Sequence, residues 1–221
     1  MAPAVAAVLL VLAVLAGCAP TAPVPPPRAP SAARPPDAPP AGASYETLLE
    51  FAKVHPADAD FGGLRMAFAR SPHYQPYRSY PDLSAAMRDA LRDQDWPSVL
   101  RLAQSALEIN YVRARPHLHA ARAQRALGNA AAAAHHRAMA EGLVKSVLAS
   151  GDGLTPETAM VVIDIGEEYD VLAALRLRST SQGLATQSGR PMDRHAVVAE
   201  DGREFSMFFD VALPFARNPM R

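Results

Sequence analysis

Residues 160–165 read Met-Val-Val-Ile-Asp-Ile, and the pattern of the sequence changes at this stretch. Its run of β-branched and other apolar residues predicts a short strand. Between residues 44 and 150, apolar residues recur at intervals of three or four positions, which predicts helices. Two further strand-like segments follow toward the C-terminus. Helices first and strands last predict an α+β fold, with a helical region over 44–150 and an α+β region over 151–221.

Five helices are expected before the strand, each from a stripe of apolar residues at helical spacing. The first stripe ends before His55-Pro56, where proline disfavours further helix, and the second follows Asp82, which we expect to cap its N-terminus. The third begins at Trp96-Pro97, and the last two end at Gly128-Asn129 and Ser150-Gly151. The five stripes comprise Tyr45, Leu48, Leu49 and Ala52; Leu83, Met87, Ala90 and Leu91; Val99, Leu100, Ala103, Ala106 and Leu107; Leu118, Ala121 and Leu127; and Ala133, Met139, Leu143, Val147 and Leu148.

The last four helices show an internal period, since Val99 and Ala133, for example, occupy equivalent positions 34 residues apart. A helix-turn-helix period of this length resembles the tetratricopeptide repeat. The best matches are residues 106–110 and Leu127-Gly128-Asn129. Two such units are too few to stand alone, so we expect them to pack against the rest of the body. An unrelated helical bundle is the alternative.

A β-hairpin is predicted near the C-terminus. Residues 195–198 and 205–211 flank Glu200-Asp201-Gly202-Arg203, whose Asp-Gly pair favours a tight turn. One face of the last strand is apolar because Phe205, Met207, Phe209 and Val211 alternate with other residues. With a helix over residues 167–175, the expected C-terminal part is a small antiparallel sheet with one helix.

The N-terminal segment is predicted to be a targeting signal over residues 1–17. Ala4 to Ala16 is an unbroken apolar run, too short to span a bilayer but of the length of a signal-peptide core. It ends in Leu15-Ala16-Gly17-Cys18, which resembles a bacterial lipobox, although no basic residue precedes the run. The resemblance implies cleavage between Gly17 and Cys18, lipid on Cys18 and, because Ala19 follows, anchoring in the outer membrane. An ordinary cleaved signal peptide is the alternative.

Residues 18–43 are predicted to form a lipidated stalk without a core. Ten prolines fall within residues 19–42, and such composition favours an extended, semi-rigid spacer. A ligand for a proline-binding module is the alternative.

Composition excludes several classes of protein. The 22 basic and 22 acidic side chains balance, which argues against nucleic-acid binding. The single cysteine excludes an internal disulfide and a thiolate metal site. Motifs for a serine-hydrolase elbow, a phosphate loop, a zinc protease and a dinucleotide fold are also missing from the sequence. We therefore expect no catalytic residue, cofactor or metal.

The body over residues 45–211 resembles a family of unknown function, DUF4919, found mostly in bacterial exported proteins. The resemblance implies repeat-like helices followed by a small sheet, and it implies no mechanism. It rests on Asp60-Phe61, Leu64-Arg65, Ala67-Phe68 and Tyr74-Gln75-Pro76-Tyr77; on Ser150-Gly151-Asp152-Gly153, Thr155-Pro156-Glu157-Thr158-Ala159 and Val162-Ile163; and on Glu168-Tyr169 and Phe208-Phe209-Asp210-Val211.

Asp60, Arg65, Tyr74 and Tyr77 form a candidate ligand cluster, because an arginine fork with two tyrosines could bind a carboxylate or a sugar. The structural alternative pairs Arg65 with Asp60 and folds the tyrosine segment over the first helix.

The loop of Gly151, Asp152 and Gly153 could bind an anion or calcium, but it lacks the several acids of a calcium loop, so a turn after a helix is favoured. His117, His119, His135 and His136 are expected to be structural. Residues two apart do not share a helix face, although one histidine from each helix could converge.

The predicted function is a non-catalytic, membrane-anchored adaptor whose inner helices, including Arg88 and Arg122, bind a protein partner in the cell envelope. The alternative is an envelope small-ligand binder or enzyme that uses Asp60, Arg65, Tyr74 and Tyr77.

Overall fold

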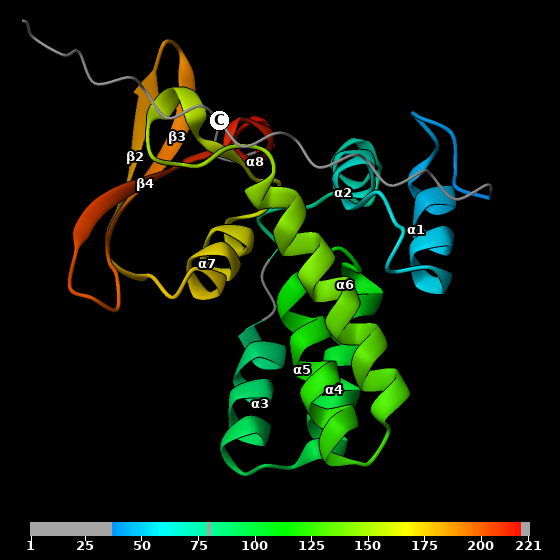
Figure 1. Cartoon of the computed structure of the whole chain (residues 1–221). Helices are drawn as coiled ribbons and strands as arrows, with labels where there is room; N and C mark the ends of the chain where they lie inside the picture. Colours follow the sequence, from blue (N-terminus) through cyan, green and yellow to red (C-terminus); the bar gives the residue numbers. More distant parts are fainter. Residues whose placement is uncertain (1–36, 79–80, 218–221) are drawn as a thin grey trace, which may run out of the picture. The chain divides into compact units, whose positions relative to one another are not determined.

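The stretch at residues 160–165 joins a helical part to a sheet in the computed structural model, which describes residues 37–78 and 81–217 (Figure 1). These residues belong to one unit that extends over 34–221. Gly17, Cys18 and the stalk before Asp37 lie outside the described residues. No helix within the described ranges is long and apolar enough to cross a membrane.

The α+β class is confirmed, with most helices preceding the sheet. The helices are α1 (Tyr45–Val54), α2 (Phe61–Arg70), α3 (Pro81–Arg92), α4 (Trp96–Ile109), α5 (Ala114–Ala126), α6 (Ala130–Leu148), the 3₁₀ helix η1 (Pro156–Thr158), α7 (Ile165–Ala174) and α8 (Ala212–Ala216). The strands are β1 (Met160–Val161), β2 (Arg178–Gln187), β3 (Arg190–Val198) and β4 (Glu204–Asp210).

Helices α3 to α6 form two consecutive helical hairpins that lie side by side (Figure 1). Their turns repeat in detail. The Asp95 N–H donates to the Ala90 carbonyl, and 34 residues later the Asn129 N–H donates to the Gln124 carbonyl. Gln94 and Gly128, also 34 residues apart, both have positive φ, of 56° and 83°. The predicted period is therefore present in the backbone hydrogen bonding.

The apolar stripe predicted for α5 was wrong. Leu118 and Leu127 are 46% and 41% exposed. The buried face is shifted and consists mainly of small residues, because α5 lies between α4 and α6 and close helix packing favours short side chains. The buried residues of α5 are Ala114, Pro116, His117, Ala120 and Ala123.

Two helix predictions also need correction. Asp82 lies inside the first turn of α3 and is not its cap, since that helix begins at Pro81. Helix α2 was not predicted, because Gly62 and Gly63 lower helix propensity at its start. Asp60 compensates as the N-cap, where its carboxylate accepts the Gly63 N–H at 2.8 Å.

The sheet has the strand order β1-β4-β3-β2 and is mixed, whereas an antiparallel sheet was expected. β3 pairs antiparallel with both β2 and β4, as the Asp-Gly turn predicted for the second pair. β1 instead runs parallel to β4, because the chain passes through α7, β2 and β3 before it returns to the β1 edge. β1 has only two residues, since Asp164 already caps α7.

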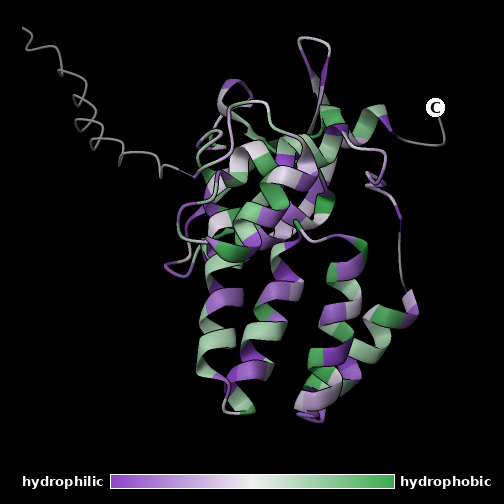
Figure 2. Ribbon diagram, turned by 90° about the vertical axis from the view of Figure 1, so that its right-hand side faces the viewer, coloured by the Kyte–Doolittle hydropathy of each residue, from purple (hydrophilic) through white to green (hydrophobic). Residues whose placement is uncertain are grey.

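Three apolar clusters hold these elements together, and α6 contributes to two of them. Val144 packs against the cluster around α1 and α2 and also against the cluster under the sheet. The third cluster lies between α3, α4 and α5. Along the helices of Figure 2, hydrophobic and hydrophilic segments alternate, as amphipathic helices require. α6 thus connects the helical hairpins to the sheet.

Candidate functional site

Arg65 is buried and pairs with Glu167, so the expected Arg65–Asp60 pair is wrong. Its guanidinium donates to both carboxylate oxygens of Glu167, at 2.7 Å from Nε and 2.6 Å from Nη2. Nη2 also donates to the Val161 carbonyl at 2.9 Å. Burial raises the pKa of Glu167, while the hydrogen bonds and charge of Arg65 oppose that rise. The pair links α2 to β1 and α7.

Tyr74 also has a structural contact. Its hydroxyl donates to the Ile163 carbonyl at 2.6 Å, and its ring meets Phe68 edge to face. Burial raises the pKa of the Tyr74 hydroxyl above its ordinary value. Arg65 and Tyr74 therefore both bind the backbone near residues 161–163, while Asp60 caps α2. Of the four residues in the predicted ligand cluster, Arg65 and Tyr74 are buried, whereas Asp60 and Tyr77 are exposed.

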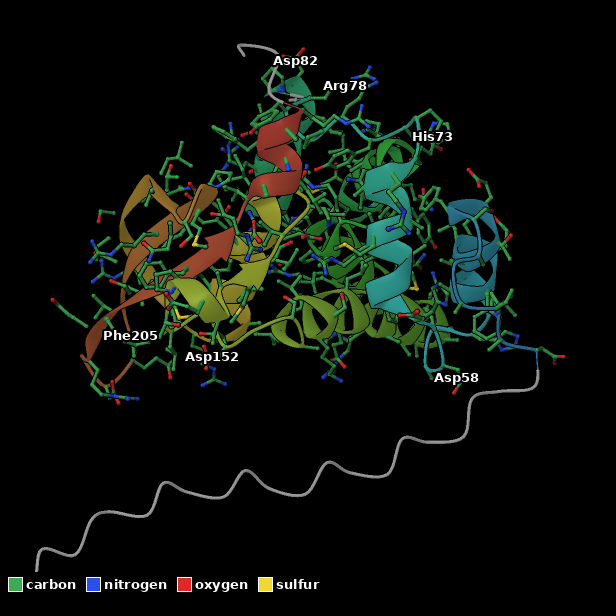
Figure 3. The ribbon with its side chains drawn as sticks, turned by 90° about the horizontal axis from the view of Figure 1, so that it is seen from above. Asp58, His73, Arg78, Asp82, Asp152 and Phe205 are labelled. Carbon is green, nitrogen blue, oxygen red and sulfur yellow. The ribbon has the colours of Figure 1, made fainter. Side chains whose placement is uncertain are left out.

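A groove of about 1030 Å³ opens beside Tyr77. Its walls are α3, the end of α4, the starts of α5 and α7, and residues 72–78. In Figure 3, His73 and Arg78 lie along the same edge of the unit as Asp82, on the side opposite Asp58 and Asp152. The groove thus runs from the inner helices of the repeats to the junction with the sheet.

Basic side chains outnumber acidic ones around this groove. Arg113 pairs with Asp164 at 3.1 Å, and Arg115 reaches Asp170 at 2.8 Å. Arg88 is exposed on α3 and forms no ion pair with any described residue. The ionisable residues of the lining are Arg78, Arg88, Arg113, Arg115, His73, His119, Glu108 and Asp164, with Tyr77 beside them.

A second polar cluster, which the sequence analysis missed, lies between α7 and the sheet. Glu168 and His195 are both fully buried, and His195 Nε2 lies 2.7 Å from Glu168 Oε2. The Gln182 amide donates to Asp193 Oδ2 at 2.6 Å and to Glu168 Oε2 at 3.3 Å. Ser179 Oγ lies 2.9 Å from His195 Nδ1. We call Glu168, Asp193, His195 and Gln182 the acid cluster.

Strand geometry explains how the acid cluster forms. A β-bulge between Ser179 and Ser181 shifts the register of β2, so that Ser179 and Gln182 both face His195. Asp193 and His195 occupy the same alternating face of β3 as the buried Val197. Polar residues at inward positions of a strand were the signal that could have revealed the cluster.

Burial raises the pKa of Glu168 to about 7, and the nearby charge of Asp193 adds to the rise, while the hydrogen bond with His195 opposes it. Glu168 Oε2 accepts hydrogen bonds, but Glu168 Oε1 is buried and has no hydrogen-bond partner among the described residues. A buried acceptor without a donor costs free energy, so Glu168 Oε1 lacks, within the described part of the chain, a hydrogen-bond donor that its burial would favour.

One histidine from each of two helices does converge. His117 Nδ1 and His136 Nδ1 are 2.9 Å apart, and His117 Nε2 lies 2.9 Å from the Tyr111 carbonyl oxygen. Burial lowers the pKa of His117 to about 4, so the imidazole is neutral at pH 7. No group of three possible metal ligands was found among the described residues, which include all seven histidines.

The loop over residues 150–153 forms a turn between α6 and η1. Gly153 has a φ of 69°, which favours glycine, and its N–H donates to the Thr158 carbonyl at 2.8 Å. Asp152 accepts hydrogen bonds from Leu154 N–H and the Thr158 hydroxyl. Gly151 packs closely against the Thr158 backbone. These contacts account for the loop without an ion.

Comparison with known proteins places this architecture in a family. No curated protein and no solved structure matches the chain. Residues 45–218 match the family described as a domain of unknown function, DUF4919, which covers all of the helices and strands described above. The chain therefore belongs to the DUF4919 family.

Proposed function

We propose that this protein is a non-catalytic adaptor of the bacterial cell envelope, and that the groove beside α3 and α5 binds an acidic segment of a partner protein. The charge of the groove carries the proposal. Four arginines line it, of which Arg113 and Arg115 pair with Asp164 and Asp170, while Arg88 forms no ion pair with a described residue. With Glu108 as the remaining acid of the lining, basic side chains are still in excess. An acidic peptide complements this excess of positive charge.

Apolar side chains on α3 support binding of a peptide rather than of a small anion alone. Leu83, Met87 and Leu91 lie along the groove beside Arg88, so an extended segment gains both apolar contact and charge pairing. The start of α5, which has no side-chain cap, also reaches the groove, and helix N-termini favour negative charge.

Placement in the envelope is a proposal from the sequence. The lipobox-like residues before Cys18 and the proline-rich stalk after it support an outer-membrane lipid anchor that holds the groove away from the bilayer. The body would then face the periplasm.

The test is in-cell crosslinking followed by mass spectrometry, comparing Arg88→Glu with Arg122→Glu. Arg88 lines the groove. Arg122, which the sequence placed on the same binding surface, does not line it and instead lies 5.0 Å from the centroid of the Trp96 ring, so the proposal now assigns partner binding to Arg88 and not to Arg122. Both variants change the net charge equally. We expect Arg88→Glu to capture at least about tenfold less partner than the unmodified protein. Reversal of one charge at a binding site costs at least about 1.4 kcal/mol of binding free energy, which corresponds to a factor of ten.

Arg122→Glu should retain the partner, and Cys18→Ser should retain groove binding but release the complex from membranes. Capture by Arg88→Glu at the level of the unmodified protein would contradict the groove. A protein that stays in the membrane fraction after Cys18→Ser would contradict the lipid anchor.

A further inference from the structure

The acid cluster contains two buried carboxylates but no arginine or lysine. Glu168 is fully buried, and Asp193 is 7% exposed. Among the described residues, no lysine or arginine forms an ion pair with either of them. Buried carboxylates elsewhere in the protein do have such partners, as Glu167 has Arg65 and Asp210 has Arg190. Two buried carboxylates whose one basic neighbour in the described part of the chain is His195, at 2.7 Å from Glu168, lack the permanent cation that the other buried acids have.

The donors present in the cluster are already used. Gln182 donates its two amide hydrogens to Asp193 Oδ2 and Glu168 Oε2, and its Oε1 accepts from the Tyr169 hydroxyl at 2.6 Å. His195 Nε2 also contacts Oε2. Nothing remains for Glu168 Oε1, which is the buried oxygen without a partner among the described residues. The missing partner is a hydrogen-bond donor, and the local charge favours a cationic one.

Tyr169 contacts the acid cluster and is itself exposed, and Tyr77 is a second exposed tyrosine whose pKa responds to the charges of the cluster. Tyr169 is 41% exposed, and its ring meets His195 edge to face at 5.5 Å. Tyr77 is 38% exposed at the groove. Burial raises its pKa, and the charges of Asp193 and Glu168 add to the rise. Aromatic faces beside carboxylates favour organic cations through cation–π contact.

We propose that the acid cluster is a binding site for a primary ammonium group, which donates an N–H to Glu168 Oε1 and is flanked by Tyr77 and Tyr169. The ammonium group would reach Glu168 when a tyrosine side chain rotates away, since exposed side chains change rotamer readily. The source of the ammonium group is a free polyamine, a lysine side chain or a peptide N-terminus. Tyr77 borders both this site and the peptide groove, but Glu168, Asp193, His195 and Gln182 do not line the groove, and the proposal does not depend on the proposed function.

Isothermal titration with three probes tests the site: spermidine, Nα-acetyl-lysine amide and glycyl-glycine amide. Nα,Nε-diacetyl-lysine amide, which has no ammonium group, is the control probe. We expect at least one ammonium probe to bind, and Glu168→Gln to weaken that binding at least about tenfold, as loss of a charged hydrogen bond does. Glu204→Gln, an exposed acid on β4, is the matched control variant and should bind like the unmodified protein.

Proton release offers a second measurement on the unmodified protein. Ammonium binding requires ionised Glu168, whose pKa is raised to about 7, so binding near pH 6 should release protons and tighten toward pH 8. The other groups acting on Glu168 are Asp193, His195 and Asp164. Titration in buffers of different ionisation enthalpy measures this release.

The probe that binds identifies the source of the ammonium group. The proposal is overturned if no ammonium probe binds more tightly than the diacetylated control. It is also overturned if Glu168→Gln, shown by circular dichroism to be folded, binds as tightly as the unmodified protein, or if binding releases no proton near pH 6. Partner capture by the groove is unaffected by any of these outcomes.

Discussion

Arg65 connects more elements than any surface arginine does, through a bidentate pair with Glu167 and hydrogen bonds to Val161 and Ser146. Arg65→Met would leave the Glu167 carboxylate buried without its cation. We expect a loss of about 3–5 kcal/mol in the free energy of unfolding, the cost typical of breaking a buried ion pair. Urea unfolding followed by circular dichroism measures it.

The double variant Arg65→Met/Glu167→Leu supplies the control, because it removes both charges together. It should recover much of the lost stability, since an apolar pair of similar volume often replaces a buried ion pair at little cost. Arg92→Met, which breaks an exposed pair with Asp89, should leave the unfolding midpoint nearly unchanged. If Arg65→Met were as stable as Arg92→Met, the buried pair would not be holding α2 to α7.

The sequence singled out Arg65 and Tyr74 but not their partners. Glu167 is 102 residues from Arg65, and Ile163 is 89 residues from Tyr74, so no local spacing links them. The structural alternative paired Arg65 with Asp60, five residues away, while in the folded chain Asp60 caps α2. Long-range pairing of charges depends on the packing of α2 against α6 and α7, which local patterns do not specify.

Helix α6 lies against α2 because Gly142 leaves room for the Phe61 ring, with which an added Cβ would overlap. Gly142→Ala should therefore destabilise the fold by about 1–3 kcal/mol, as overpacking does, even though alanine favours helix more than glycine. Thermal unfolding measures the change. The Phe61 ring must move to relieve the overlap. The expected destabilisation therefore arises at the contact between α2 and α6.

Two variants separate this contact from an intrinsic effect of alanine. Gly183→Ala on β2, where an added Cβ meets nothing within 4 Å, should have little effect. Phe61→Leu should restore part of the stability in the Gly142→Ala background, because leucine is smaller than phenylalanine. A Gly142→Ala protein that unfolds at the original temperature would show that α6 and α2 can separate without cost.

Elements with a strong repeating pattern were predictable and the others were not. Apolar periodicity predicted α3, α4 and α6, the 34-residue period also predicted α5 despite its wrong apolar stripe, and the Asp-Gly turn predicted the β3–β4 hairpin. β2 was missed because its residues are mostly exposed and polar, so no alternation shows in Arg178–Gln187. The strand predicted over residues 160–165 was too long, since β1 ends at Val161. Val162 and Ile163, which suggested a longer strand, are buried but lie outside any strand.

At the scale of the whole molecule, two buried groups give opposite dependences of stability on pH. His117 has its pKa lowered from 6.5 to about 4, so the unfolded chain takes up a proton first as the pH falls, and stability decreases from pH 6.5 toward 4. Glu168 has its pKa raised from 4.5 to about 7, so the unfolded chain loses a proton first as the pH rises, and stability decreases from pH 4.5 toward 7.

Each of these pKa shifts changes the free energy of unfolding by roughly 3 kcal/mol across its pH range, at about 1.36 kcal/mol per pKa unit. Between pH 4.5 and 6.5 the two effects oppose each other, and the free energy of unfolding should change little in the unmodified protein. His117→Gln removes one effect, so its stability should fall as the pH rises through this range. Glu168→Gln removes the other, so its stability should rise instead. Urea unfolding at pH 4.5, 5.5 and 6.5 measures all three slopes, and equal slopes in the two variants would show that neither buried group sets the pH dependence.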